Sequence, residues 1–198
     1  MNSAHYAHWP PGQAHELTAP ATSVHVNLEV SARRYPSRAA TIFYDSALAY
    51  SQLRDDAERL AGHLQRECGV RRGDRVLLYM QNSPQWVVAF YAILRADAVV
   101  VPVSPALVTE ELRYFVTDSG AKVAVAAQEL FPRLAPLVRA TPLAHAVVAT
   151  YSDYLTAPTE LAVPELVRAP RDVPPAAGVV PWRRALEAGH LPHPHQAA

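Results

Sequence analysis

Apolar positions recur along this chain at spacings that predict helices in some segments and strands in others. A short helical pattern spans about 26–34 and stops before Pro36, because the residue before a proline avoids helix. A longer one follows Ser51, which we expect to cap it, and ends at Gly69. Its apolar residues fall on one helical face: Leu53, Ala57, Leu60, Ala61 and Leu64. Between these two helices, runs at 40–44 and 48–50 predict a hairpin that turns through Asp45-Ser46-Ala47.

From residue 75 onward, short continuous apolar runs alternate with helical stretches. The runs predict strands at 75–80, 99–103, 123–126 and 146–149, separated by helices at 85–95, 109–119 and about 130–138. Ser83 and Pro84 give a strong start signal for the first of these helices. Thr109 is expected to cap the second. Short connections between such elements favour right-handed βαβ units. We therefore predict an α/β fold with a mostly parallel sheet and helices on both faces.

The two ends of the chain carry no such pattern. Residues 1–22 predict an extended N-terminal arm, and 23–150 form the α/β subdomain. Residues 151–180 are rich in proline and are interpreted as a linker or an excursion along the surface. Residues 181–198 predict one short helix, beginning near Val180, and a disordered tail that forms a C-terminal arm.

Composition narrows the class of protein. Half of the 198 residues are hydrophobic, which allows a sizeable core. The net charge is zero, so the chain lacks the excess of positive charge that favours nucleic-acid binding. Cys68 is the single cysteine, so no disulfide forms within the chain. No secretory signal and no apolar run of about 18 residues is present, so we expect a cytoplasmic protein without a membrane span. Abundant alanine, proline and arginine suggest a bacterial source.

Motifs for phosphate or metal binding are not found. Neither G-x-G-x-x-G nor G-x-x-x-x-G-K-[ST] occurs, and Gly69 and Gly73 precede a strand instead of a helix. The C-terminal tail is interrupted by prolines and offers at most three ligands, whereas a structural zinc site has about four. We therefore expect no metal site from His190, His193 and His195. Three further histidines are isolated in sequence and are interpreted as surface or satisfied side chains: His25, His63 and His145. The acids Asp55, Asp56 and Glu58 suit the first turns of their helix and do not predict carboxylate catalysis.

Segments of 34–42, 48–53, 73–76, 82–84 and 94–105 together resemble the N-terminal region of adenylate-forming enzymes. This superfamily holds acyl-CoA ligases, luciferases and peptide-synthetase adenylation domains, and the resemblance is greatest to a fatty-acid CoA ligase. It covers roughly residues 24–150. Asp97 stands where the family usually has glycine, a variation that occurs in fatty-acyl-type ligases.

The resemblance implies a parent that activates a fatty acid with ATP and Mg²⁺ and transfers the acyl group to CoA. No position matches the Ser/Thr/Gly loop ending in lysine, the adenine segment or the C-terminal lysine, and Lys122, the only lysine, opens a strand. We therefore assign no catalytic, cofactor-binding or metal-binding residue and expect this chain alone to be inactive. Its expected partner is the remainder of the ligase. An apolar face left exposed for the second sheet would favour self-association.

One helix carries the aromatic residues Trp86, Phe90 and Tyr91. Burial in the core is the favoured interpretation of these side chains, and a contribution to the wall of an acyl or CoA passage is the functional one. Other functions stay open for the whole chain: a stand-alone binding or assembly domain derived from a ligase, an aryl-CoA ligase fragment, or an unrelated nucleotide-binding α/β module.

Overall fold

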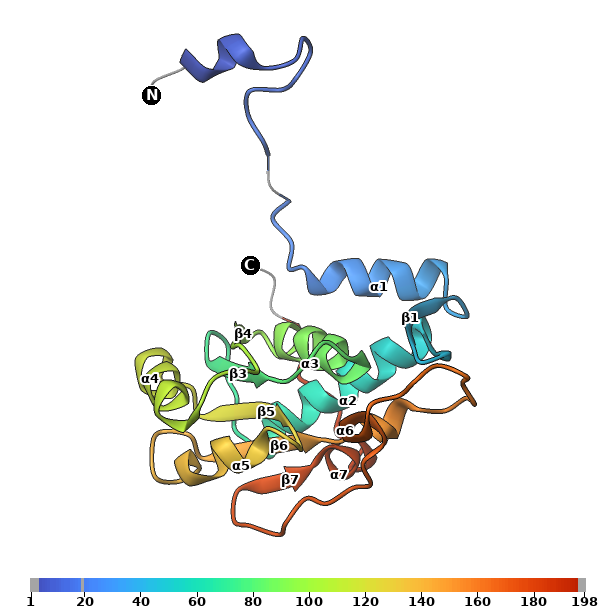
Figure 1. The fold of residues 1–198 in the computed structure, drawn as a ribbon. Helices are drawn as coiled ribbons and strands as arrows, with labels where there is room; N and C mark the ends of the chain where they lie inside the picture. Colours follow the sequence, from blue (N-terminus) through green and yellow to red (C-terminus); the bar gives the residue numbers. More distant parts are fainter. Residues whose placement is uncertain (1–3, 19, 196–198) are drawn as a thin grey trace.

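A parallel five-stranded sheet forms the centre of the molecule. In this computed structural model, which describes residues 4–18 and 20–195, the strands follow the order β4-β3-β5-β6-β7 (Figure 1). Their bounds are β3 (Arg75–Tyr79), β4 (Val99–Pro102), β5 (Val123–Ala127), β6 (His145–Ala149) and β7 (Val179–Pro181). All four neighbouring pairs are parallel, with Leu77 opposite both Val101 and Ala124. The predicted α/β class and parallel sheet are confirmed.

Helices flank the sheet (Figure 1). One group consists of α1 (His25–Arg34), α2 (Tyr50–Arg66), α3 (Pro84–Arg95) and α7 (Trp182–Glu187), with α2 packed against the other three. A second group consists of α4 (Thr109–Ser119) and α5 (Phe131–Leu134), which a 3₁₀ turn at Ala135–Leu137 extends. The helix expected at 130–138 is thus a short α-helix followed by a tighter turn.

The hairpin and two helix starts differ in detail from their predictions. Strands β1 (Ala39–Phe43) and β2 (Ser46–Ala49) turn at Tyr44 and Asp45, whose φ angles of 47° and 62° are both positive as in a type I′ turn. Ser51 does not cap α2, because the helix already begins at Tyr50 and the Ala49 N–H donates to Gln52 Oε1 at 3.0 Å.

Thr109 likewise lies inside its helix. Val108 occupies the N-cap position of α4, and its N–H donates to Glu111 Oε2 at 2.9 Å. In both helices, therefore, the side chain at the third helical position accepts from the backbone N–H of the N-cap residue, and no side-chain hydroxyl caps the helix start.

The proline-rich stretch after β6 contains more structure than its sequence suggests. It holds a 3₁₀ turn (Tyr151–Tyr154), α6 (Glu165–Arg168) and, at its end, the edge strand β7. Strand β7 was not predicted, since three residues are too few to show a period. It forms because Val179 and Val180 pair in register with Ala146 and Val147.

The described part of the C-terminal tail is docked, which contradicts the predicted disorder; residues 196–198 lie outside the described residues. Arg66 Nε donates to the Leu191 carbonyl at 2.7 Å, and the His193 N–H donates to Gln65 Oε1 at 2.7 Å. Arg95 Nη1 holds the His193 carbonyl at 2.9 Å. Side chains of α2 and α3 thus bind the backbone of the tail. At the other end, a 3₁₀ turn at Ala4–His8 lies in an arm that reaches away from the body (Figure 1).

Apolar side chains from the sheet and both helix groups form one continuous core. Tyr79 and Trp182 are among its largest fully buried members. No helix among residues 4–18 and 20–195 has the length and apolar character needed to cross a membrane.

Candidate functional site

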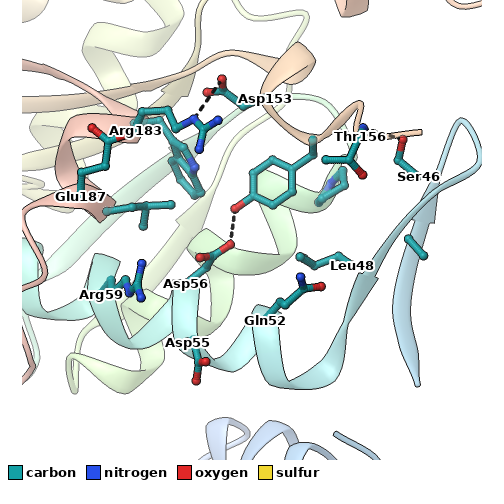
Figure 2. A pocket seen from close by; sticks show the side chains of 15 residues that line it. Ser46, Leu48, Gln52, Asp55, Asp56, Arg59, Asp153, Thr156, Arg183 and Glu187 are labelled. Carbon is teal, nitrogen blue, oxygen red and sulfur yellow. Dashed lines mark hydrogen bonds and ion pairs between the residues drawn. The ribbon is translucent and has the colours of Figure 1, made fainter. Parts of the chain in front are cut away.

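A cavity of about 470 Å³ lies between the β1–β2 hairpin, α2, the Tyr151–Tyr154 turn and α7 (Figure 2). Residues far apart in the sequence meet here because α7 packs on α2 after the chain has crossed the whole sheet. Its wall is formed by Ser46, Ala47, Leu48, Gln52, Asp55, Asp56, Arg59, Pro84, Asp153, Tyr154, Thr156, Trp182, Arg183, Leu186 and Glu187.

A partly buried hydrogen bond between Tyr154 and Asp56 forms the polar centre of this cavity. The Tyr154 hydroxyl donates to Asp56 Oδ2 at 2.7 Å. A dashed line at Asp56 marks this bond in Figure 2. Burial raises the pKa of Asp56 above its ordinary value, although the bond from Tyr154 acts in the opposite direction. Burial and the adjacent Asp56 raise the pKa of Tyr154, against a lowering contribution from the Trp182 indole. Tyr154 is therefore a neutral donor at physiological pH.

Charged groups around this centre are largely paired. The Asp153 side chain is only 4% exposed and pairs with Arg171 at 2.5 Å and with Arg183 at 3.6 Å. Asp55 pairs with Arg54 at 2.7 Å. The wall as a whole carries four carboxylates and two arginines. An excess of acidic groups is unsuited to a nucleotide triphosphate, which needs fixed donors and cations.

Trp86, Phe90 and Tyr91 lie together on α3 as a half-buried aromatic ridge. The rings of Trp86 and Phe90 stack with centroids 5.3 Å apart, and Tyr91 meets Phe90 edge to face at 5.5 Å. All three pack against the core but are only partly buried, so they lie at its edge. None of them lines the charged cavity, although Pro84 at the start of the same helix does.

Two polar contacts fix the start of α3. Ser83 Oγ accepts a hydrogen bond from the Trp86 N–H at 3.2 Å, so the predicted cap is confirmed. The buried Gln85 side chain donates to the Thr150 carbonyl at 2.7 Å, next to the end of β6. These two contacts anchor the N-terminal end of the helix that carries the aromatic ridge.

Two of the three isolated histidines are buried, which corrects their interpretation as surface or satisfied side chains. His63 is 4% exposed, and neither of its ring nitrogens has a hydrogen-bond partner among the described residues. His63 lines a second cavity, of about 540 Å³, with Cys68, His145 and His190. Burial raises the pKa of the Cys68 thiol to about 12, so this cysteine is not a thiolate nucleophile.

Sequence reasoning missed the Tyr154–Asp56 pair. The two residues are separated by 98 positions, and in the sequence Asp56 is interpreted only as an acidic residue in the first turns of its helix. Tyr154 lies in the proline-rich stretch where no element was expected.

Comparisons with known proteins agree with this fold. A sequence model of the family described as "AMP-binding enzyme" matches residues 28–188. The long-chain-fatty-acid–CoA ligase of Bacillus subtilis is 31% identical over 158 residues, which cover 80% of this chain and 28% of that protein. The corresponding ligase of Salmonella typhimurium is 28% identical over 165 residues, which cover 82% of this chain and 29% of that protein. The chain therefore spans less than a third of the length of these relatives.

Solved structures show the same architecture. An anthranilate CoA ligase in complex with anthranoyl-AMP has a TM-score of 0.61 at 26% identity, over 66% of this chain and 25% of that one. A benzoate CoA ligase from Burkholderia xenovorans has a TM-score of 0.68 at 20% identity, over 89% of this chain and 30% of that one. The second likeness concerns the fold alone.

Proposed function

The chain belongs to the AMP-binding enzyme family of adenylate-forming ligases and corresponds to the N-terminal portion of such enzymes; from this premise we propose that it forms part of a fatty-acid CoA ligase. In the proposed reaction a fatty acid and ATP give acyl-adenylate and pyrophosphate, and CoA then displaces AMP to give acyl-CoA. The observation that carries the proposal is the family match over residues 28–188 on a sheet of the same architecture.

The fatty-acid class is supported by curated relatives named as long-chain-fatty-acid–CoA ligases. An aryl acid is the second candidate, favoured by the similarity to the structure of an anthranilate CoA ligase. We place this activity in the cytoplasm. ATP, Mg²⁺ and CoA belong to the reaction proposed for the parent enzyme.

We further propose that this chain does not form acyl-adenylate by itself. Charge developing on pyrophosphate needs several fixed donors and cations, and the cavity around Tyr154 and Asp56 has twice as many carboxylates as arginines. Lys122 is exposed and precedes β5, apart from the residues that line that cavity. The remainder of a ligase is therefore the expected partner.

Pyrophosphate exchange into ATP tests this proposal. Purified chain with palmitate or benzoate, Mg²⁺, ATP and labelled pyrophosphate should show exchange no greater than a protein-free control. Exchange above that control would contradict the proposed inactivity.

Sequencing the source gene beyond codon 198 tests the assignment to a ligase independently. An in-frame Ser/Thr/Gly loop ending in lysine supports this assignment, and an immediate stop codon favours a stand-alone assembly domain.

We propose the aromatic ridge of α3 as part of an acyl-binding wall in the parent. Stacked, half-buried rings offer an apolar surface whose position is fixed by Ser83 and Gln85. A fatty acid brominated near its methyl end quenches tryptophan only on contact. Addition of this acid to the chain should quench Trp86, and Phe90→Ala should weaken the effect. Unchanged quenching in Trp86→Phe would contradict contact at the ridge.

Exposed apolar side chains on β4 and α4 support a surface that associates with the remainder of the ligase or with a second copy. They are Val99, Tyr114 and Phe115, together with Val108 immediately before α4, and Tyr114 is 64% exposed. Sedimentation should show concentration-dependent dimers that Tyr114→Ser reduces. A monomer at all concentrations that binds no hydrophobic dye would exclude self-association through this surface.

A further inference from the structure

Three potential metal ligands meet where α1 crosses α2. His25 is the first residue of α1, Glu29 lies one turn later, and Glu58 faces them from the middle of α2. One ligand atom from each residue lies within 4.8 Å of the other two. This cluster is separate from the charged cavity, since none of its members lines that wall.

The imidazole of His25 lacks the hydrogen bonds that buried polar groups normally have. Its residue is 3% exposed, and Nδ1 is inaccessible and without a partner among the described residues. Nε2 lies 3.7 Å from Glu29 Oε1, beyond hydrogen-bond distance. Nε2 therefore faces a carboxylate without a direct hydrogen bond to it, in a cluster whose ligand atoms lie within 4.8 Å of one another, and this is the nitrogen available to a ligand shared with the two carboxylates.

The protonation state of His25 suits metal binding. Burial lowers its pKa to about 4, against a raising effect from Glu29, so the ring is neutral at physiological pH. A neutral imidazole forms no ion pair with Glu29 but presents the lone pair that a metal ion requires.

Each carboxylate has one oxygen engaged by an arginine. Glu29 Oε2 lies 3.5 Å from Arg33, whose side chain is 77% exposed, and Glu58 Oε1 accepts from Arg95 Nε at 2.6 Å. A carboxylate has two oxygens, so the second oxygen of each group can bind a metal. In Glu29 this second oxygen is the one facing His25.

We propose that His25, Glu29 and Glu58 bind one zinc ion that joins α1 to α2, with water completing the coordination. A nitrogen ligand with two carboxylates fits Zn²⁺ better than Ca²⁺ or Mg²⁺, which prefer oxygen ligands. Tetrahedral ligands about 2.0–2.1 Å from zinc lie about 3.3 Å apart, so modest side-chain rotation closes the site. The sequence predicted no metal site because it presents His25 alone.

Cobalt titration of the full chain tests the proposal, because tetrahedral Co²⁺ absorbs visible light and substitutes for zinc. After treatment with a chelator, the chain should bind one Co²⁺ with visible absorption that Zn²⁺ displaces. His25→Asn should abolish this absorption. Glu29→Gln, which changes a partly exposed side chain and should leave the fold intact, should weaken affinity by at least about 100-fold. His8→Asn in the N-terminal arm is the matched control and should bind as the unmodified chain does.

Thermal unfolding gives a second measurement. Zn²⁺ should raise the Tm of the unmodified chain and of His8→Asn but not of Glu29→Gln, since a ligand that binds only the folded state stabilises it. Undiminished Co²⁺ affinity in Glu29→Gln, or loss of binding in His8→Asn, would assign the metal to other histidines and overturn the proposal. Absence of visible absorption at stoichiometric Co²⁺ would also overturn it.

Discussion

Gly62 on α2 and His190 in the C-terminal tail pack backbone against backbone, with no space for a β-carbon between them. A β-carbon on Gly62 would overlap the carbonyl group of His190. The tail is held in this position by Arg66, Gln65 and Arg95. A glycine in the middle of a 17-residue helix costs about 1 kcal/mol relative to alanine, so here the close approach of the tail offsets the lower helix propensity.

Gly62→Ala should destabilise the full chain by roughly 1–3 kcal/mol, because the methyl group forces the tail backbone away from α2. Urea unfolding followed by circular dichroism measures this change. In a chain that ends at Gly189 the same substitution should instead stabilise by about 1 kcal/mol, since only helix propensity then changes. Stabilisation of equal size in both chains would show that the tail does not dock in solution.

Ser83→Ala should lower the free energy of unfolding by about 1 kcal/mol, because the Trp86 N–H at the start of α3 loses its acceptor. Ser83→Asn should retain most of the stability, since asparagine is also a good N-cap residue. Denaturant unfolding of both variants gives the comparison. Equal loss in the two would mean that packing of this 8% exposed residue, and not capping, determines its contribution.

Tyr154→Phe should cost about 1–2 kcal/mol, because it leaves the partly buried Asp56 carboxylate without its donor. Asp56→Ala should cost a similar amount by leaving the Tyr154 hydroxyl unpaired. A double-mutant cycle with both substitutions should give a loss smaller than the sum of the two single losses. Additive losses would indicate that the hydrogen bond contributes nothing to stability.

The pH dependence of stability should carry a contribution from His63. Burial lowers its pKa below the ordinary value of 6.5, with Glu67 acting in the opposite direction and with His190 and His145 lowering it further. The unfolded chain therefore binds the proton more readily, and folding stability should fall as the pH drops below about 6.5 towards the lowered value. His63→Asn should flatten this slope, while His8→Asn should not. Parallel profiles for His63→Asn and the unmodified chain would contradict the assignment.

Local patterns were enough to predict most of the sheet and its helices. The apolar runs at 75–80 and 123–126 correspond to β3 and β5, and the Ser83-Pro84 signal placed the start of α3. Helix period, strand period and capping act over a few neighbouring residues, so one sequence reveals them. Strand β7 escaped notice because its three residues gain their conformation from pairing with β6.

The sequence by itself determined the α/β class, the parallel sheet and the resemblance to adenylate-forming ligases, all of which depend on short-range order and on motif spacing. Only the tertiary structure decided that Tyr154 meets Asp56, that His190 lies over Gly62 and that Glu58 faces His25. These contacts join residues tens to more than a hundred positions apart. They exist because helices packed on one sheet bring distant segments together. A local periodicity reports only on neighbouring residues, so it does not reveal which distant segments meet.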